Sequence, residues 1–129
     1  MRLSTAIGVL HISAVSLGCG NGLTSPSQTA IVTLVVHDEM FRVLVIGEAN
    51  VEAAIAAQNG GRARIPNGRI AIGTDVNSGW RWHLEDVQFV EAAIELCDGR
   101  PSDVERDALQ FGGGRFCPWS ASVVRIEAR

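Results

Sequence analysis

Two apolar runs separated by a polar pair mark the point where the folded part of the chain is expected to begin. Two runs dense in β-branched residues, Thr29 to His37 and Met40 to Ile46, are separated by the polar pair Asp38-Glu39. Two such runs around a short polar turn are typical of a β-hairpin. The pattern therefore predicts two antiparallel strands at this point of the chain.

The following segment changes to a helical period. Its alanine-rich sequence, ANVEAAIAAQ over residues 49–58, places Val51 and Ala54 at helical spacing. Asn50 is a candidate N-cap, and the sequence NGG at 59–61 supplies a stop signal. We therefore predict the main helix over residues 49–58.

Period-two alternation returns further along the chain. It spans residues 62–73 around the triplet PNG at 66–68, which is interpreted as a turn or an edge-strand kink. It recurs from Trp80 to Leu84, where Trp80 and Trp82 would share one face, and again from Ser122 to Ile126. These segments add at least three strands to the predicted hairpin.

Two stretches between these strands are less regular. Residues 86–98 fit a helix by the spacing of their polar positions and a strand by their apolar alternation, so periodicity leaves both open. Pro101, Asp103 and Glu105 are typical of a helix N-terminus and predict a short helix over 101–110, followed by a glycine-rich loop at 111–116. The chain as a whole predicts an α+β fold with an antiparallel sheet of five or six strands.

The N-terminus resembles an export signal. An apolar run follows Arg2 and ends in Ser16-Leu17-Gly18-Cys19, which is similar to a bacterial lipobox. The run is shorter than the roughly 20 residues of a membrane span, and the alternative is an ordinary first strand or helix. We expect a lipoprotein-type signal peptide at 1–18, lipidation of Cys19, a flexible tether at 19–28 and a single domain at 29–129.

Composition excludes several classes of functional site. All 11 basic residues are arginine, and the chain has no lysine and no tyrosine. These absences exclude a P-loop lysine, a Schiff-base lysine and a tyrosine acid. The net charge of −3 without a basic cluster argues against nucleic-acid binding, which requires neutralisation of phosphates.

Cys97 and Cys117 form the other cysteine pattern. In an oxidising compartment two such cysteines are typically joined, so we predict a disulfide that holds the segment between them. The alternative is a nucleophilic cysteine paired with His83.

The C-terminal half also carries a family signature. The strings VNSGWRWHLEDVQFVEAAIELCD at 76–98, GRPSDVE and FCPWSASVV resemble a family of small exported domains. That family includes many uncharacterised bacterial proteins and the N-terminal part of a slime-mould calmodulin-binding protein. The resemblance implies a small α+β domain and a strand over 87–97. It implies no reaction and does not carry calmodulin binding to an exported bacterial chain.

Three further groups of residues have the composition of catalytic or ligand sites. His83, Glu85 and Asp86, with His37 or Asp98, are of metal-ligating type, although a histidine hydrogen-bonded beside aromatic rings is the plainer interpretation. Glu91 and Glu95 would share a face, as acid–base catalysts or simply in solvent. The sequence FGGGR at 111–115 superficially resembles a phosphate loop but lacks its lysine.

The tryptophans supply the preferred candidate site. Trp80 and Trp119 adjoin turns, where an indole ring can be partly exposed to a ligand. With Trp82, His83 and Arg115 they would form a recognition face; the alternative is that the three indoles belong to the core.

These observations favour an exported, lipid-anchored binding module without catalytic residues, metal or cofactor. The expected partner is an unknown protein or a small polar ligand, with the membrane contacted only through the lipid, and the module is expected to be a monomer in the cell envelope or secreted. Two alternatives remain: a protease-inhibitor-like module that presents a disulfide-held loop, and a small metal-assisted hydrolase that uses His83.

Overall fold

The computed structural model describes residues 28–60, 64–91 and 95–129. The predicted signal peptide and Cys19 lie outside these residues, so their assignment stays a prediction. Within the described residues, no helix has the length and apolarity needed to cross a membrane.

The first sheet is built on the predicted hairpin. Strands β1 (Thr29–Val36) and β2 (Glu39–Ile46) pair antiparallel, and β6 (Ser122–Ala128) pairs with the other side of β1. The turn lies one residue earlier than predicted, because His37 takes a left-handed φ of 53° and Glu39 already pairs with Val36. β6 contains an irregularity opposite Thr33 and Leu34, so an otherwise open edge strand is bent there.

The second sheet has the order β4-β3-β5. Strands β3 (Arg64–Ile72) and β4 (Trp82–Glu91) pair antiparallel, and the two-residue β5 (Arg115–Phe116) adds to β3. The triplet 66–68 is therefore inside a strand and is not a turn. β4 carries one extra residue opposite Gly68, where a Cβ atom would lie 2.9 Å from Leu84 Cβ. Only glycine permits this close approach.

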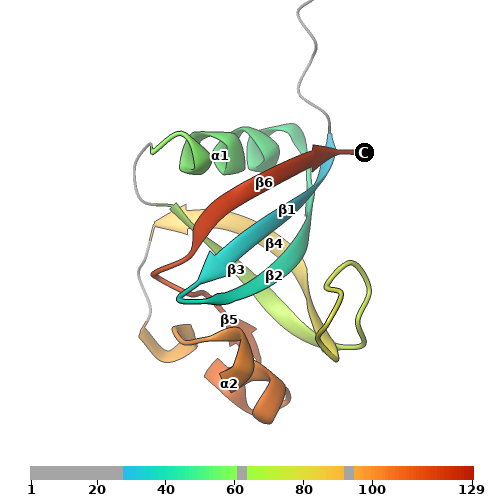
Figure 1. Cartoon of the computed structure of the whole chain (residues 1–129), viewed down its shortest axis with the longest axis vertical. Coiled ribbons are helices and arrows are strands. Elements are labelled where there is room, and N and C mark those ends of the chain that lie inside the picture. Colours follow the sequence, from blue (N-terminus) through green and yellow to red (C-terminus); the bar gives the residue numbers. More distant parts are fainter. Residues whose placement is uncertain (1–27, 61–63, 92–94) are drawn as a thin grey trace, which may run out of the picture.

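The two sheets face each other and enclose the main core (Figure 1). Their edge strands β2 and β4 run next to one another. The inward side chains are mainly aliphatic residues of the first sheet and larger residues of the second: Val32, Leu34, Val36, Phe41, Val43, Val45, Trp82, Leu84, Phe89 and Phe116. The prediction of an α+β fold with five or six antiparallel strands is confirmed; there are six, and they divide into two three-stranded sheets.

The two helices lie at opposite ends of these sheets (Figure 1). Helix α1 (Glu48–Gln58) buries Val51 and Ala54, as its spacing predicts. The N-cap is Gly47, so the assignment of Asn50 as the cap is wrong: its amide lies inside the first turn and donates to Ile46 O at 3.0 Å.

The second helix is shorter than predicted. Helix α2 (Pro101–Arg106) ends where Asp107 leaves the helical conformation, with φ −153°. The chain then turns into the 3₁₀ segment η2 (Phe111–Gly113), which lets Phe111 pack against Phe116. A tertiary contact therefore ended a helix that local sequence would continue.

The ambiguous segment 86–98 contains two structures. It is strand up to Glu91, at the end of β4, and the 3₁₀ segment η1 over Glu95–Cys97, with residues 92–94 outside the described part. The strand implied by the family resemblance is thus correct for the first half and wrong at η1, where the chain bends to bring Cys97 beside Cys117.

Candidate functional site

The three tryptophans of the predicted recognition face have different surroundings. Trp82 is fully buried, with its ring centroid 5.5 Å from that of Phe116. Trp80 is half-buried, and its Nε1 donates to Met40 O at 2.8 Å. Trp119 is 40% exposed and makes none of the ring–ring contacts found among the described residues. Trp80 and Trp82 therefore pack together, while Trp119 stands apart from them.

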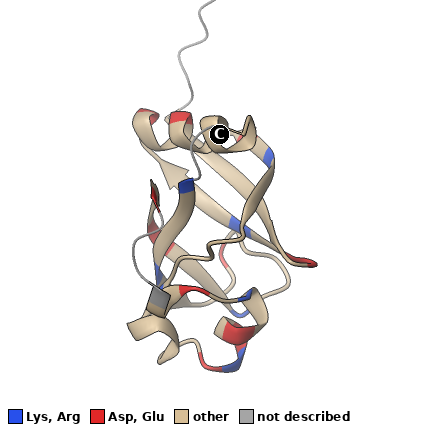
Figure 2. Cartoon of the chain, turned by 90° about the vertical axis from the view of Figure 1, so that its left-hand side faces the viewer, with Lys and Arg blue, Asp and Glu red and all other residues tan. Residues whose placement is uncertain are grey.

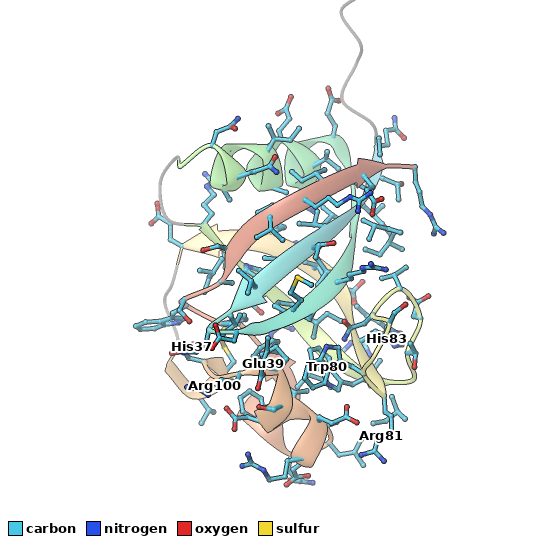
Figure 3. All side chains as sticks on the ribbon, viewed as in Figure 1. His37, Glu39, Trp80, Arg81, His83 and Arg100 are labelled. Atoms are coloured by element: carbon cyan, nitrogen blue, oxygen red, sulfur yellow. A yellow bond between two sulfur atoms is a disulfide. The ribbon has the colours of Figure 1, made fainter. Side chains whose placement is uncertain are left out.

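His83 points away from Trp82, because successive side chains of a strand alternate between its faces. Its Nδ1 lies 2.7 Å from Gly73 O, which only accepts, so Nδ1 carries the proton and donates. Its Nε2 lies 3.4 Å from Glu85 Oε1. The imidazole thus braces the end of β3 on the outer face of the second sheet (Figure 3).

Arg115 shares this outer face. It lies opposite Arg69 in the ladder between β5 and β3, and its Nη2 and Nε contact Asn67 Oδ1 at 2.7 and 2.9 Å. Arg69 in turn contacts Glu85 Oε2 at 2.5 Å. The structure therefore brings Arg115 and His83 to one surface and places the indole of Trp82 on the opposite side of the sheet.

The candidate metal ligands are not assembled. Among the described residues no three His, Cys, Asp or Glu side chains are grouped to hold a metal ion. His37 lies at the turn between β1 and β2, well apart from His83 (Figure 3). Glu91 and Glu95 belong to different elements, since β4 ends at Glu91 and η1 begins at Glu95.

The predicted disulfide is confirmed. Cys97 and Cys117 are joined, with their Cα atoms 5.1 Å apart, and both are buried against Ile65 in a small second core. Gly112 lies directly over the bridge with a φ of 55°, where a Cβ atom would lie 2.9 Å from Cys97 Cα. The glycine-rich segment therefore serves close packing on the disulfide.

The main hollow of interest lies where α2 meets the end of the second sheet. We call it the α2 hollow; its volume is about 330 Å³, and it is lined by Ile72, Arg81, Trp82, Glu105, Arg106, Asp107, Ala108 and Leu109. Ile72 and Leu109 are 62% and 72% exposed on its margin, whereas Trp82 is fully buried. Large apolar side chains are thus left in water around a concave surface.

An ion pair holds the wall of the α2 hollow in place. Glu105 Oε1 accepts from Arg81 Nε at 2.5 Å, and Glu105 Oε2 accepts from the Arg81 backbone N–H at 3.0 Å. These hydrogen bonds, the side-chain one first, hold the pKa of Glu105 below its ordinary value of 4.5. Figure 3 shows Arg81 beside α2. Glu105 is therefore a carboxylate at neutral pH and not a proton donor.

Two carboxylates, those of Glu39 and Asp103, hold the N-terminal end of α2. Glu39 Oε2 accepts from the backbone N–H of Ser102 at 2.9 Å, and Asp103 Oδ2 accepts from the Arg100 N–H at 3.0 Å. Both positive and negative positions lie in and around α2 (Figure 2). The rim of the α2 hollow therefore carries both charges.

Sequence analysis missed Asn77, which holds the two sheets together. Asn77 is fully buried; its Oδ1 accepts from the Arg42 N–H of β2 and its Nδ2 donates to Trp82 O of β4, both at 2.9 Å. A signal was present, since this asparagine opens the sequence NSGW at 77–80, within the string that carries the family resemblance. Its burial, however, depends on β2, which is remote in sequence.

Comparisons with known proteins give one match. The family model described as the BP-74 N-terminal domain matches residues 28–129. No curated protein and no solved structure matches the chain. The family resemblance inferred from the C-terminal motifs is confirmed, and the match extends it over the N-terminal hairpin and α1.

Proposed function

We propose that this chain, which belongs to the BP-74 N-terminal domain family, is an exported, lipid-anchored binding module without catalytic activity. The lipid would be attached at Cys19, and the α2 hollow would be the ligand site. Of the residues predicted for the recognition face, Trp82 alone is among those that line this hollow. The proposed site therefore lies on the side of β4 opposite to His83.

The exposed apolar margin of the α2 hollow is the observation that carries the proposal. Ile72 ends β3 and Leu109 lies in the turn after α2, yet both border one concavity whose wall includes Trp82. Small-molecule sites are concave and mostly apolar, with few polar groups that orient the ligand. A hollow of about 330 Å³ is at the lower end of such sites and suits a small ligand.

The polar groups nearby support binding over catalysis, because they are engaged in holding the fold. Arg81 and Glu105 bind each other, and Arg106 contacts Asp103 at 3.2 Å. A general base or nucleophile needs a neighbour within hydrogen-bonding reach that activates it. The described residues around the hollow supply a structural ion pair instead.

The disulfide-held segment does not support the inhibitor alternative. It folds into α2 and η2, and it buries Val104 fully in the main core. An inhibitor of the kind considered would present an extended, rigid loop to a protease cleft. The same segment instead supplies one wall of the α2 hollow.

The test is to map the binding of small amphiphilic fragments by NMR on the oxidised, ¹⁵N-labelled full chain. We expect saturable shifts confined to the amides of Ile72, Ala108 and Leu109. Leu109→Glu should abolish them, because it places a carboxylate on the apolar margin. Leu96→Glu is the matched control, since Leu96 is also 72% exposed but does not line the hollow. An absence of shifts at the hollow would refute the proposed site.

A further inference from the structure

Trp82, which lines the α2 hollow, has one buried polar atom that lacks the partner its chemistry requires. The Nε1 of Trp82 is buried and has no hydrogen-bond partner among the described residues. An indole N–H can only donate, and leaving a buried donor unpaired costs free energy. Such atoms are rare in folded proteins, and each calls for a physical explanation.

The surrounding donors show that this fold normally satisfies its polar groups. The Nε1 of Trp80 reaches Met40 O at 2.8 Å, and the Nδ2 of Asn77 reaches Trp82 O at 2.9 Å. The unpaired donor therefore belongs to the one tryptophan that lines the α2 hollow.

Building on the proposed function, we infer that the α2 hollow takes a small neutral ligand in which a compact apolar group carries a hydrogen-bond-accepting oxygen. The oxygen accepts from Trp82 Nε1, and the apolar group packs against Ile72, Ala108 and Leu109. A single indole donor among apolar side chains orients a ligand and selects for the acceptor.

The rim explains why the ligand is neutral. Arg81 and Glu105 already bind each other through two hydrogen bonds, and Arg106 contacts Asp103. An anionic ligand would have to displace a carboxylate from one of these pairs and would also face Asp107 on the lining. A cationic ligand would meet the indole N–H, which can only donate. A carbonyl or hydroxyl oxygen needs no such exchange.

Entry of the ligand requires a local rearrangement, because Nε1 is closed to solvent. An oxygen reaches this atom only when a lining side chain turns aside. Ile72 and Leu109 are the lining apolar side chains with room to turn, since 62% and 72% of each is exposed.

The experiment compares two probes of equal shape, cyclohexanone and methylenecyclohexane, which differ in having an oxygen or a CH₂ group. The oxidised, ¹⁵N-labelled full chain is titrated with each, and the three indole N–H signals are followed. The variants Trp80→Phe and Trp119→Phe identify the Trp82 signal by removing the other two. Leu109→Glu and Leu96→Glu again serve as the test and control variants.

We expect cyclohexanone to move the Trp82 indole proton downfield in a saturable manner, and methylenecyclohexane to bind without that shift. Leu109→Glu should raise the dissociation constant for cyclohexanone roughly tenfold or more, through loss of apolar contact, and Leu96→Glu should leave it unchanged.

The possible failures are distinguishable. If both probes shift the amides of the hollow but leave the Trp82 indole signal in place, the hollow binds apolar groups and the oxygen preference is wrong. That result would indicate that the Trp82 N–H donates to the face of the Phe116 ring, whose plane lies at 82° to the indole. If neither probe nor any fragment shifts the hollow, the proposed function fails together with this inference.

Discussion

Replacing Asn77 by alanine tests how the two sheets are held together. The side chain is fully buried and makes two hydrogen bonds of 2.9 Å, one from the Arg42 N–H and one to Trp82 O. Asn77→Ala leaves both backbone groups without this partner and removes the only described side chain that bonds to the backbone of both β2 and β4.

The expected loss follows from the burial of the two abandoned groups. An unsatisfied buried polar group costs about 1–3 kcal/mol. The bond to Trp82 O is buried, whereas the bond from Arg42 is partly buried, so water can replace the latter in part. We therefore expect Asn77→Ala to lower the free energy of unfolding by about 3 kcal/mol in total.

Urea unfolding followed by tryptophan fluorescence measures this loss. The midpoint should fall while the slope m is retained, because the surface exposed on unfolding hardly changes. Asn50→Ala is the control: its amide donates to Ile46 O from an exposed position in α1, so its effect should stay within about 0.5 kcal/mol. A loss below about 1 kcal/mol for Asn77→Ala would refute the proposed role of Asn77 in joining the two sheets. It would show that the sheets are held together by apolar packing alone.

Three further predictions concern the disulfide, the α2 ion pair and the N-terminus. Replacing both Cys97 and Cys117 by serine should lower the free energy of unfolding by roughly 3 kcal/mol, measured by urea unfolding; a change below about 1 kcal/mol would contradict a structural role for the bridge. Because the pKa of Glu105 is lowered in the folded state, its contribution to stability is present above the ordinary value of 4.5 and is lost as the pH falls through the folded-state pKa. Arg81→Ala should reduce this acid-dependent loss of stability, measured as the fall of the thermal unfolding temperature below pH 4.5. If the pH dependence of the unfolding temperature is unchanged in the variant, the Arg81–Glu105 pair does not contribute to stability. Mass spectrometry of the membrane fraction should find a diacylated peptide beginning at Cys19, and recovery of Met1 at the N-terminus would refute both export processing and the anchor.

Local sequence patterns were sufficient to predict an element where its conformation depends on its own residues. The hairpin follows from two β-branched runs around a polar pair, and α1 follows from helical spacing that ends before glycine. The disulfide was also predicted, on the expectation that the chain is exported to an oxidising compartment, and the structure contains it. The errors within these elements are displacements by one residue at the turn and at the start of α1, and the assignment of the N-cap to Asn50 in place of Gly47.

Local patterns failed where a distant contact decides the conformation. Segment 86–98 satisfied two periods, and the pairing of β4 with β3 fixed its first half as a strand. The α2 helix ended at Arg106 instead of 110, since the chain turns there to pack Phe111 on Phe116. The triplet 66–68 has the composition of a turn, but it lies inside β3. Its glycine is explained by the bulge of β4 opposite Gly68, which cannot be inferred from the local sequence.

The candidate site likewise divides into features that the sequence predicted and features that only the tertiary structure decided. Sequence by itself placed Trp80, Trp82 and His83 on one predicted strand, and its motifs indicated the family to which the chain belongs. It placed Arg115 in a glycine-rich loop, whereas the structure has it in the short strand β5. Tertiary structure decided which of them meet: β4 directs Trp82 inward and His83 outward, and α2 folds back to place Ala108 and Leu109 beside Ile72. The physical reason is that strand alternation is encoded locally, whereas the face that becomes the core, and the concavity left at its edge, depends on how remote segments pack.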